Sequence, residues 1–191
     1  MNQEIEIEFK NLLTKEEYGR ITERYFPDQH PIANQVNHYF DTKTFSLKNM
    51  HSALRIREKQ GKRVLTLKQP LKEGILETHQ PLSENEAETI IQHGILPAGQ
   101  VADLLFDMGI NPQSLHHFGS LETNRMEGEI EGGLLVLDHS LYLGHEDFEL
   151  EFEATHYENG KKQFEEILKS LNIPGRSTDN KIKRFYDRKF K

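Results

Sequence analysis

The chain has 191 residues, a formal net charge of −7 and no cysteine. The length suffices for one domain with a substantial core, and the 31 acidic against 24 basic residues disfavour a general nucleic-acid binder, whose surface would be basic. The lack of cysteine excludes disulfides, thiolate metal sites and cysteine nucleophiles, and the lack of any apolar run of ~18 residues predicts a cytoplasmic protein that neither spans nor contacts a membrane.

The first predicted strand, residues 4–10, alternates charged and apolar residues. Because side chains alternate between the faces of a strand, one face carries three glutamates and Lys10, and the other carries Ile5, Ile7 and Phe9. One such strand by itself is typical of the solvated face of an antiparallel sheet. The pattern returns at residues 148–153, and the strands between carry Arg and Lys. Acidic and basic strands together indicate a site for metal ions and a polyanion.

Capping boxes begin two of the predicted helices, one at residues 14–17 and one at residues 83–86. The first helix ends before Pro27, and the second ends near Gly94. A two-residue turn at Gln60-Gly61 joins two strands into a hairpin. The other elements predicted in this half are strands over residues 35–41, 52–59, 62–69 and 74–81, and a helical stretch over 98–108.

The second half of the chain returns to strands, predicted over residues 115–129, 134–143 and 148–154. A helix follows over residues 158–171, with apolar residues at helical spacing, and Pro174-Gly175 ends it. A terminal helix is predicted over residues 179–189, with one basic residue directed inward and the others solvated. These elements make about eight strands, mostly joined as antiparallel neighbours.

Charged and apolar residues occupy opposite faces of several predicted strands, as where Arg55 and Arg57 alternate with Leu54 and Ile56. If the apolar faces pack under helices, the charged faces must converge on one another or face bulk water. A closed antiparallel barrel satisfies the first option and leaves no exposed edge. Such an interior needs cations, phosphates and water, since each unpaired buried ion costs several kcal/mol. We therefore predict an α+β fold, a closed eight-stranded antiparallel β-barrel or tunnel with a charged interior and helices packed outside.

Seven short features occur in order along nearly the whole chain. They are Glu6-Ile7-Glu8-Phe9-Lys10, Leu54-Arg55-Ile56-Arg57, Leu65-Thr66-Leu67-Lys68, Glu122-Thr123-Asn124-Arg125, Leu137-Asp138, Glu149-Leu150-Glu151 and the late Lys181. In this order they resemble the CYTH superfamily, the triphosphate tunnel metalloenzymes, which include thiamine triphosphatases, inorganic triphosphatases and class IV adenylyl cyclases. The resemblance implies a single tunnel domain over residues 1–191, including C-terminal helices from about residue 158.

The resemblance also implies roles for individual residues. The implied ligands of Mg²⁺ or Mn²⁺, which with Lys10 make the catalytic set, are Glu6, Glu8, Glu149 and Glu151. The implied phosphate-binding residues are Lys10, Arg55, Arg57, Lys68, Arg125 and Lys181. Supporting carboxylates would be Asp138, Glu77 and Glu153. Hard divalent cations prefer carboxylate oxygens, and Arg and Lys suit phosphate oxygens.

The implied function is metal-dependent hydrolysis of a small-molecule triphosphate, either inorganic tripolyphosphate or an organic or nucleoside triphosphate. Class IV cyclases resemble one another in a His-Phe pair ahead of the first glutamate. Here five residues precede Glu6 and none is His or Phe, which favours hydrolysis over cyclisation. Two alternatives stay open: an adenylyl cyclase-like lyase, and a polyphosphate- or nucleotide-binding module without turnover. The sequence leaves the oligomeric state undetermined.

Overall fold

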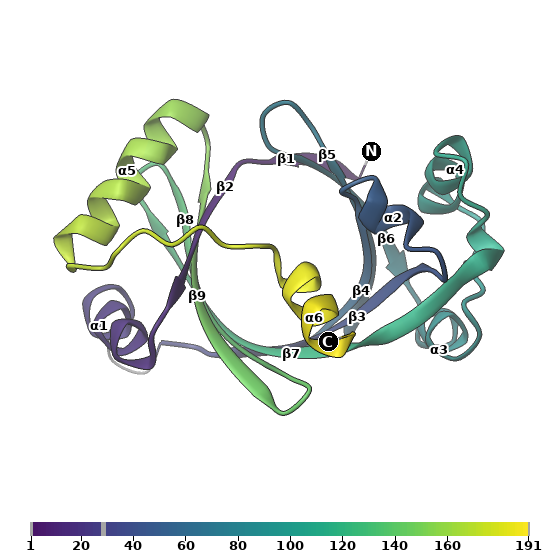
Figure 1. Ribbon diagram of the computed structural model, residues 1–191, viewed down its shortest axis with the longest axis horizontal. Helices are drawn as coiled ribbons and strands as arrows, with labels where there is room; N and C mark the ends of the chain where they lie inside the picture. Colours follow the sequence, from purple (N-terminus) through teal and green to yellow (C-terminus); the bar gives the residue numbers. More distant parts are fainter. Residues whose placement is uncertain (1, 28–29, 191) are drawn as a thin grey trace. The chain divides into compact units, whose positions relative to one another are not determined.

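The computed structural model describes residues 2–27 and 30–190 (Figure 1). The chain divides into two compact units. The first unit comprises Met1–Ile5 and Gln35–Leu121, and the second comprises Glu6–Asn34 and Glu122–Lys191. Each unit is built on antiparallel strands with helices packed on one face, in agreement with the predicted α+β class.

The first unit holds a sheet with the strand order β1-β6-β5-β4-β3. Its strands are β1 (Gln3–Glu6), β3 (Ala33–Thr42), β4 (Ala53–Lys59), β5 (Lys62–Pro70) and β6 (Ile75–Leu82), and its helices are α2 (Ser46–Asn49), α3 (Glu84–His93), α4 (Gln100–Asp107) and the 3-10 turn η1 (Pro112–Ser114). Leu54 and Leu65 from the strands share one buried cluster with Ile90 of α3 and Leu105 of α4. The opposite face of β4 and β5 therefore carries Arg55, Arg57 and Lys68.

The predicted hairpin between β4 and β5 is confirmed. Lys59 lies opposite Lys62, so the turn has two residues, Gln60 and Gly61. Both have positive φ, 51° and 74°, which is the backbone twist that favours a tight two-residue hairpin. This register places Arg55 opposite Thr66 and fixes which residues share the charged face.

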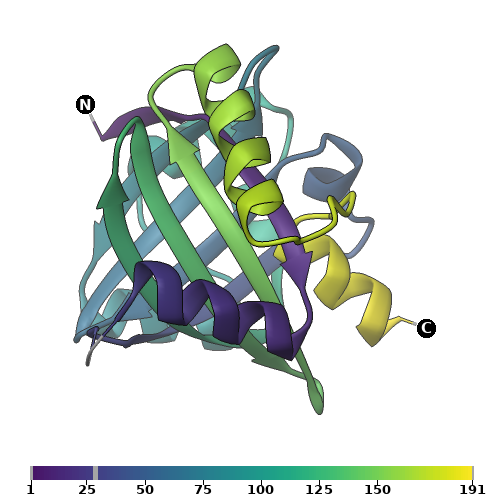
Figure 2. The same ribbon diagram turned by 90° about the vertical axis from the view of Figure 1, so that its left-hand side faces the viewer.

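The second unit holds the strand order β7-β8-β9-β2. Its strands are β2 (Glu8–Leu13), β7 (Leu115–Ile130, which begins in the first unit), β8 (Gly133–Tyr142) and β9 (His145–Ala154), and its helices are α1 (Lys15–Tyr25), α5 (Tyr157–Ser170) and α6 (Lys181–Lys189). Figure 2 shows α1 and α5 against the same side of β8 and β9. A cluster that includes Ile21, Leu137, Leu150 and Phe164 fills the space between them.

Helix α5 approaches the sheet closely at Gly160. A Cβ atom there would lie 2.3 Å from the Cβ of Ala154 and 2.9 Å from the ring of Phe9, so only glycine fits at this point of α5. The ring of Phe9 also stacks on Phe164, with 6.2 Å between centroids. The apolar face of the N-terminal strand predicted from its alternation thus packs under a helix at Phe9.

The predicted first strand, residues 4–10, differs from the structure. It breaks at Ile7 into β1 and β2, which gives nine strands where eight were predicted. The chain changes its hydrogen-bonding partner at the break: the Asn2 carbonyl accepts from His79 of β6 at 2.8 Å, and the Ile7 carbonyl accepts from Ala154 of β9 at 2.8 Å. Ile5, predicted on the apolar face, is 62% exposed.

The helix boundaries follow their caps. The Thr14–Glu17 and Ser83–Glu86 capping boxes are both present, as predicted. The terminal helix begins at Lys181, two residues later than predicted, because the Asn180 side chain accepts a hydrogen bond from the Lys183 amide and caps it. Helix α2 was not predicted.

Among the helices of the described residues, none combines the length and hydropathy needed to span a lipid bilayer.

Candidate active site

Charged residues line the face of the second unit's sheet opposite its apolar core. Antiparallel register places Arg125 of β7 opposite Asp138 of β8, and Asp138 opposite Glu149 of β9. Lys10 of β2 lies opposite Glu151. Residues far apart in the sequence therefore become lateral neighbours, because each strand directs alternate side chains to the same face.

Arg125 is the buried cation of this row. Its Nε and one terminal nitrogen donate to the two oxygens of Asp138 at 2.7 and 2.6 Å, and the same terminal nitrogen donates to Glu151 at 2.8 Å. Asp138 is fully buried, and Arg125 is 6% exposed. Burial opposes the positive charge, but Asp138 and Glu151 outweigh it and raise the pKa of Arg125 well above its usual range.

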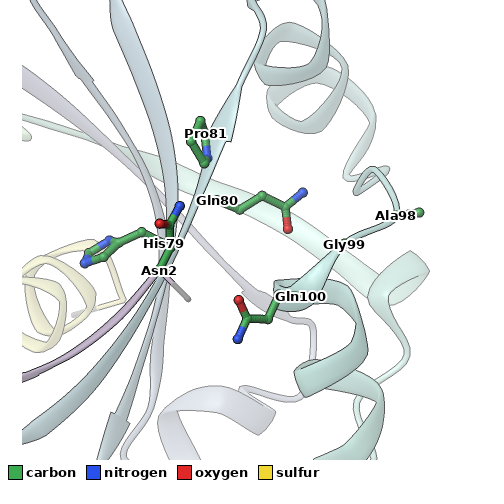
Figure 3. A pocket seen from close by; sticks show the side chains of 7 residues that line it. All are labelled: Asn2, His79, Gln80, Pro81, Ala98, Gly99 and Gln100. Carbon is green, nitrogen blue, oxygen red and sulfur yellow. The ribbon is translucent and has the colours of Figure 1, made fainter.

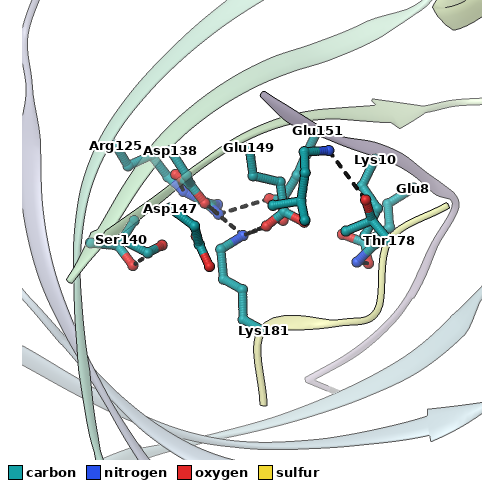
Figure 4. Close-up of polar contacts among 12 residues, drawn as sticks. Glu8, Lys10, Arg125, Asp138, Ser140, Asp147, Glu149, Glu151, Thr178 and Lys181 are labelled. Atoms are coloured by element: carbon teal, nitrogen blue, oxygen red, sulfur yellow. Dashed lines mark hydrogen bonds and ion pairs between the residues drawn. The ribbon is translucent and has the colours of Figure 1, made fainter. Parts of the chain in front are cut away.

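Lys181, from the first turn of α6, places its ammonium group among three carboxylates (Figure 4). Its Nζ lies 2.8 Å from Asp138 and 2.5 Å from Glu149, and it also contacts Glu151. Oxygens of these three carboxylates lie within 4.8 Å of one another. We call Asp138, Glu149 and Glu151 the acidic trio.

Two members of the acidic trio, Asp138 and Glu151, are held in their ionised forms by neighbouring cations. Burial raises the pKa of Glu151, but Lys181, Arg125 and Lys10 outweigh it and hold that pKa well below the usual range. The pKa of Asp138 is lowered in the same way, since Arg125 and Lys181 offset its burial. The trio in turn raises the pKa of Lys181 well above its ordinary value, against burial. Asp138, Glu151, Arg125 and Lys181 are therefore held in their charged forms at neutral pH.

Arg184 is a second cation from α6 that the sequence pattern did not single out. It bonds both oxygens of Glu149, at 3.0 and 3.1 Å, and its Nε donates to Asp147 at 3.1 Å. The expectation that one basic residue of this helix reaches inward is thus corrected to two, Lys181 and Arg184. Their spacing of three residues, which puts side chains on the same side of a helix, is the signal that would have found Arg184. Lys183 is exposed, as predicted for the rest of the tail.

The four glutamates predicted to bind metal fall into two groups. Glu149 and Glu151 join Asp138 in the acidic trio. Glu8 contacts Lys10 and lies opposite Glu153 in the sheet. Burial is the main cause that raises the pKa of Glu153 to about 7, and Glu6 adds to it, so Glu6 and Glu8 belong to the surroundings of Glu153. Glu8, Glu151 and Glu149 also raise the pKa of Lys10 against the effect of its burial.

This group predicts a pH dependence of stability for the metal-free protein. Glu153 keeps its proton up to about pH 7 in the folded state, but the unfolded chain loses it near 4.5. The unfolded state binds fewer protons between these values, so stability falls as pH rises through that window. Glu153→Gln should remove this loss. The free energy of unfolding at pH 8 minus that at pH 5 should therefore be higher in the variant than in the wild type by roughly 1–3 kcal/mol, as measured by urea unfolding in chelator. Glu88→Gln, at an exposed site on α3, is the control, and an equal effect of both changes would contradict the assignment.

The first unit carries the remaining predicted phosphate-binding residues on its charged face. Lys68 contacts Glu77, which lies opposite it in the sheet, and a terminal nitrogen of Arg55 lies 4.0 Å from Glu77. The Nε of Arg57 donates to the side chain of Asn37 at 3.1 Å. Glu77 is 3% exposed, so the predicted supporting carboxylate is a buried partner of Lys68 and Arg55.

His79 is a further polar residue of this face that the sequence did not single out. Its Nε2 lies 3.0 Å from Glu4 and 3.5 Å from Glu77, and its Nδ1 lies 3.0 Å from the hydroxyl of Thr66. His79 also borders a pocket of about 470 Å³ next to α4 (Figure 3). The lining residues are Asn2, His79, Gln80, Pro81, Ala98, Gly99 and Gln100. Since this lining contains no Lys or Arg, the pocket is poorly suited to a polyanion.

The acidic trio fits a divalent metal ion. It offers three carboxylates whose oxygens converge, which is the donor type that Mg²⁺ and Mn²⁺ prefer. The ammonium of Lys181 already stands at the point of convergence, so the position is electrostatically suited to a cation. Asp138, predicted as a supporting carboxylate, is on this geometry as well placed to hold a metal as Glu149 and Glu151.

A family model and a named relative both match this chain. The family model described as "CYTH domain" matches residues 4–186. A Bacillus subtilis protein named "Putative triphosphatase YjbK" is 51% identical over 191 residues, which is 100% of this chain and 99% of that protein. Nearly the whole chain is thus covered by both kinds of match.

The solved structures similar to this chain include two that cover at least 96% of it. A Bacillus halodurans protein, described as a "putative adenylate cyclase", is 46% identical with a TM-score of 0.93, covering 97% of this chain and 100% of that one. A Hippeastrum protein is 26% identical with a TM-score of 0.81, covering 96% of each chain. It is described as a "putative adenylyl cyclase" that has a dominant triphosphatase activity. The similarity to the first structure confirms the predicted antiparallel barrel fold, with the strand count corrected to nine.

Proposed function

This chain belongs to the CYTH domain family, and we propose that it is a metal-dependent enzyme that hydrolyses a small-molecule triphosphate. The observation that carries the proposal is the buried alternation of Arg125 and Lys181 with the acidic trio on one face of the second unit. Three carboxylates supply ligands for Mg²⁺ or Mn²⁺, and the two cations supply donors for phosphate oxygens. A cytoplasmic location and a single-domain organisation remain predictions within this proposal.

The charges of the site favour binding of metal and triphosphate together. Lys181 and Arg125 are neutralised by the acidic trio in the structure, so neither is available to phosphate while those contacts last. When bound, a divalent ion would neutralise the carboxylates, polarise a phosphoryl oxygen and make a bound water more acidic. The two side chains could then turn from carboxylate to phosphate oxygens at little cost in charge. We therefore expect each ligand to raise the affinity of the other.

Hydrolysis needs groups that stabilise negative charge on the leaving phosphate as the phosphoanhydride bond breaks and water adds to phosphorus. Once the acidic trio is neutralised, Arg125 of β7 and Lys181 in the first turn of α6 would donate to phosphate oxygens from anchored backbone positions. Arg184 orients Glu149 by bonding both of its oxygens. The family resemblance assigns additional phosphate contacts to Lys10, Arg55, Arg57 and Lys68, additional metal contacts to Glu6 and Glu8, and supporting roles to Glu77 and Glu153; these assignments stay predictions.

The proposal predicts the products. A site that recognises mainly the phosphates should convert tripolyphosphate to diphosphate and phosphate at least as well as it hydrolyses ATP. Phosphate release should be measured from tripolyphosphate, ATP and thiamine triphosphate, each with Mg²⁺, Mn²⁺ or a chelator. Activity should disappear in chelator and return with metal.

An adenylyl cyclase is the second candidate, because the Bacillus halodurans relative carries that description. The same reactions with ATP should be analysed for cyclic AMP. Cyclic AMP as the main product, with tripolyphosphate untouched, would replace hydrolysis by cyclisation. Tight binding of tripolyphosphate with no product in either metal would instead indicate a binding module.

A further inference from the structure

The segment between α5 and α6, residues 171–180, has no regular structure, yet it is tied to β2 at several points. The amide nitrogen of Leu12 donates to the Thr178 hydroxyl at 3.2 Å. The side chain of Asn11, which is 1% exposed, donates to the Pro174 carbonyl at 3.2 Å and accepts from the Arg176 amide at 2.5 Å. One buried amide group thus holds the backbone on both sides of Gly175.

Arg176 makes the strongest contacts of the segment. Its two terminal nitrogens donate to the two oxygens of Glu17 at 2.7 and 2.9 Å, and one of them also donates to the Leu12 carbonyl at 2.9 Å. Glu17 is 6% exposed, and its Oε2 also accepts from the Thr14 amide in the capping box of α1. A bidentate Arg–carboxylate pair fixes direction as well as distance, so Arg176 is held on two elements at once.

These contacts lie five residues before Lys181 in the chain. Asn180 then caps α6, and Lys181 in its first turn enters the acidic trio while Arg184 bonds Glu149. Lysine has four rotatable side-chain bonds and offers a point charge, so the position of its ammonium depends on where its helix begins.

We propose that Arg176, through its contacts with Glu17 and the backbone of β2, is a positioning residue that sets the start of α6 and thereby holds Lys181 in the acidic trio. The proposal rests on the proposed function, in which Lys181 binds phosphate. Arg176 itself has no assigned contact with substrate. Its role is distinct from general stabilisation, because its loss should affect hydrolysis only through Lys181.

The first test needs no activity. In the intact protein Lys181 is buried among carboxylates, whereas Lys183 of the same helix is exposed. Acetic anhydride should therefore label Lys181 slowly, and mass spectrometry would follow both lysines. Arg176→Ala should speed labelling of Lys181 about tenfold, because an ammonium released from the acidic trio becomes accessible to the reagent, and it should leave Lys183 unchanged. Arg176→Lys keeps the charge without the bidentate pair, so Lys181 should be labelled at an intermediate rate. This variant provides the test if the alanine variant does not fold.

The second test is a double-mutant cycle with tripolyphosphate and Mg²⁺. Arg176→Ala should lower kcat/KM about tenfold alone but less than about twofold in a Lys181→Met background, because coupled residues are not additive. Arg63→Ala, which removes an Arg that pairs with Glu58 and Glu84 in the first unit, is the matched control and should have no effect on either readout. Unchanged labelling of Lys181 in both Arg176 variants, or equal losses of kcat/KM in both backgrounds, would overturn the inference. If the wild-type protein hydrolyses no triphosphate, the proposed function fails, and the labelling result still decides the positioning role.

Discussion

Glu151→Gln is expected to lower triphosphate hydrolysis at least ~10²-fold, the scale of a lost charge-stabilising group, while the protein stays folded. The side chain of Glu151 forms ion pairs with both Lys181 and Arg125 and belongs to the acidic trio. Glutamine keeps the shape but removes the charge, so it should weaken metal binding and disturb two proposed phosphate ligands at once. Initial rates with tripolyphosphate over a range of Mg²⁺ or Mn²⁺ would measure the loss, and the metal concentration for half-maximal rate should rise.

The matched control is Glu166→Gln, at an exposed position of α5 in the same unit. It makes the same chemical change away from the acidic trio and should keep full activity. The assignment of Glu151 as a metal ligand would be wrong if the Glu151→Gln variant hydrolysed tripolyphosphate as fast as the wild type at limiting metal. Undiminished hydrolysis in chelator would likewise contradict it.

Arg125→Ala is expected to destabilise the protein by about 3–5 kcal/mol, the cost of leaving buried charges without their partner. Asp138 is fully buried and takes two hydrogen bonds from Arg125, and Glu151 takes a third. Urea unfolding without metal would measure the change in the free energy of unfolding. The surface pair control Arg63→Ala should leave the free energy of unfolding nearly unchanged.

A double variant separates stability from function at this position. Arg125→Leu with Asp138→Leu removes both partners of the pair, so it should recover much of the stability lost in Arg125→Ala. It should remain inactive, because a phosphate donor and a proposed metal ligand are both gone. A double variant no more stable than Arg125→Ala would show that the pair is not the source of the destabilisation.

Local structure was predictable wherever neighbours in the sequence decide it. The Thr14–Glu17 capping box satisfies backbone amides within four residues, and the Gln60-Gly61 turn needs only the conformations of two residues. Alternation likewise predicted that Arg55 and Leu54 lie on opposite faces, since the period of a strand is two. The break at Ile7 was not predictable in this way, because it results from a change of partner strand from β6 to β9.

The candidate site divides along the same line. Arg125, Lys181, Glu149 and Glu151 were recognisable by residue type and order, and the structure brings them together. The position of Asp138 beside Glu149 depends on strand register. The contact of Arg184 with Glu149 depends on where α6 begins. Arg176 carried no sequence signal, because its partners Glu17 and Leu12 lie more than 150 positions away.

By itself, the sequence determined most of the elements, except α2 and the break between β1 and β2, and it determined which strand faces carry charge. Capping, turn geometry and side-chain alternation act between near neighbours, so they can be predicted without the fold. It also supplied the residue types from which the family and a metal and phosphate chemistry follow. Only the tertiary structure decided which charged groups lie close together. Asp138 lies with Glu149 and Glu151, whereas Glu6 and Glu8 lie near Glu153. The segment before Lys181 is hydrogen-bonded to β2. The physical reason is that a buried charge is stabilised by the partners within a few ångströms, and those distances are set by strand register and helix docking rather than by sequence spacing.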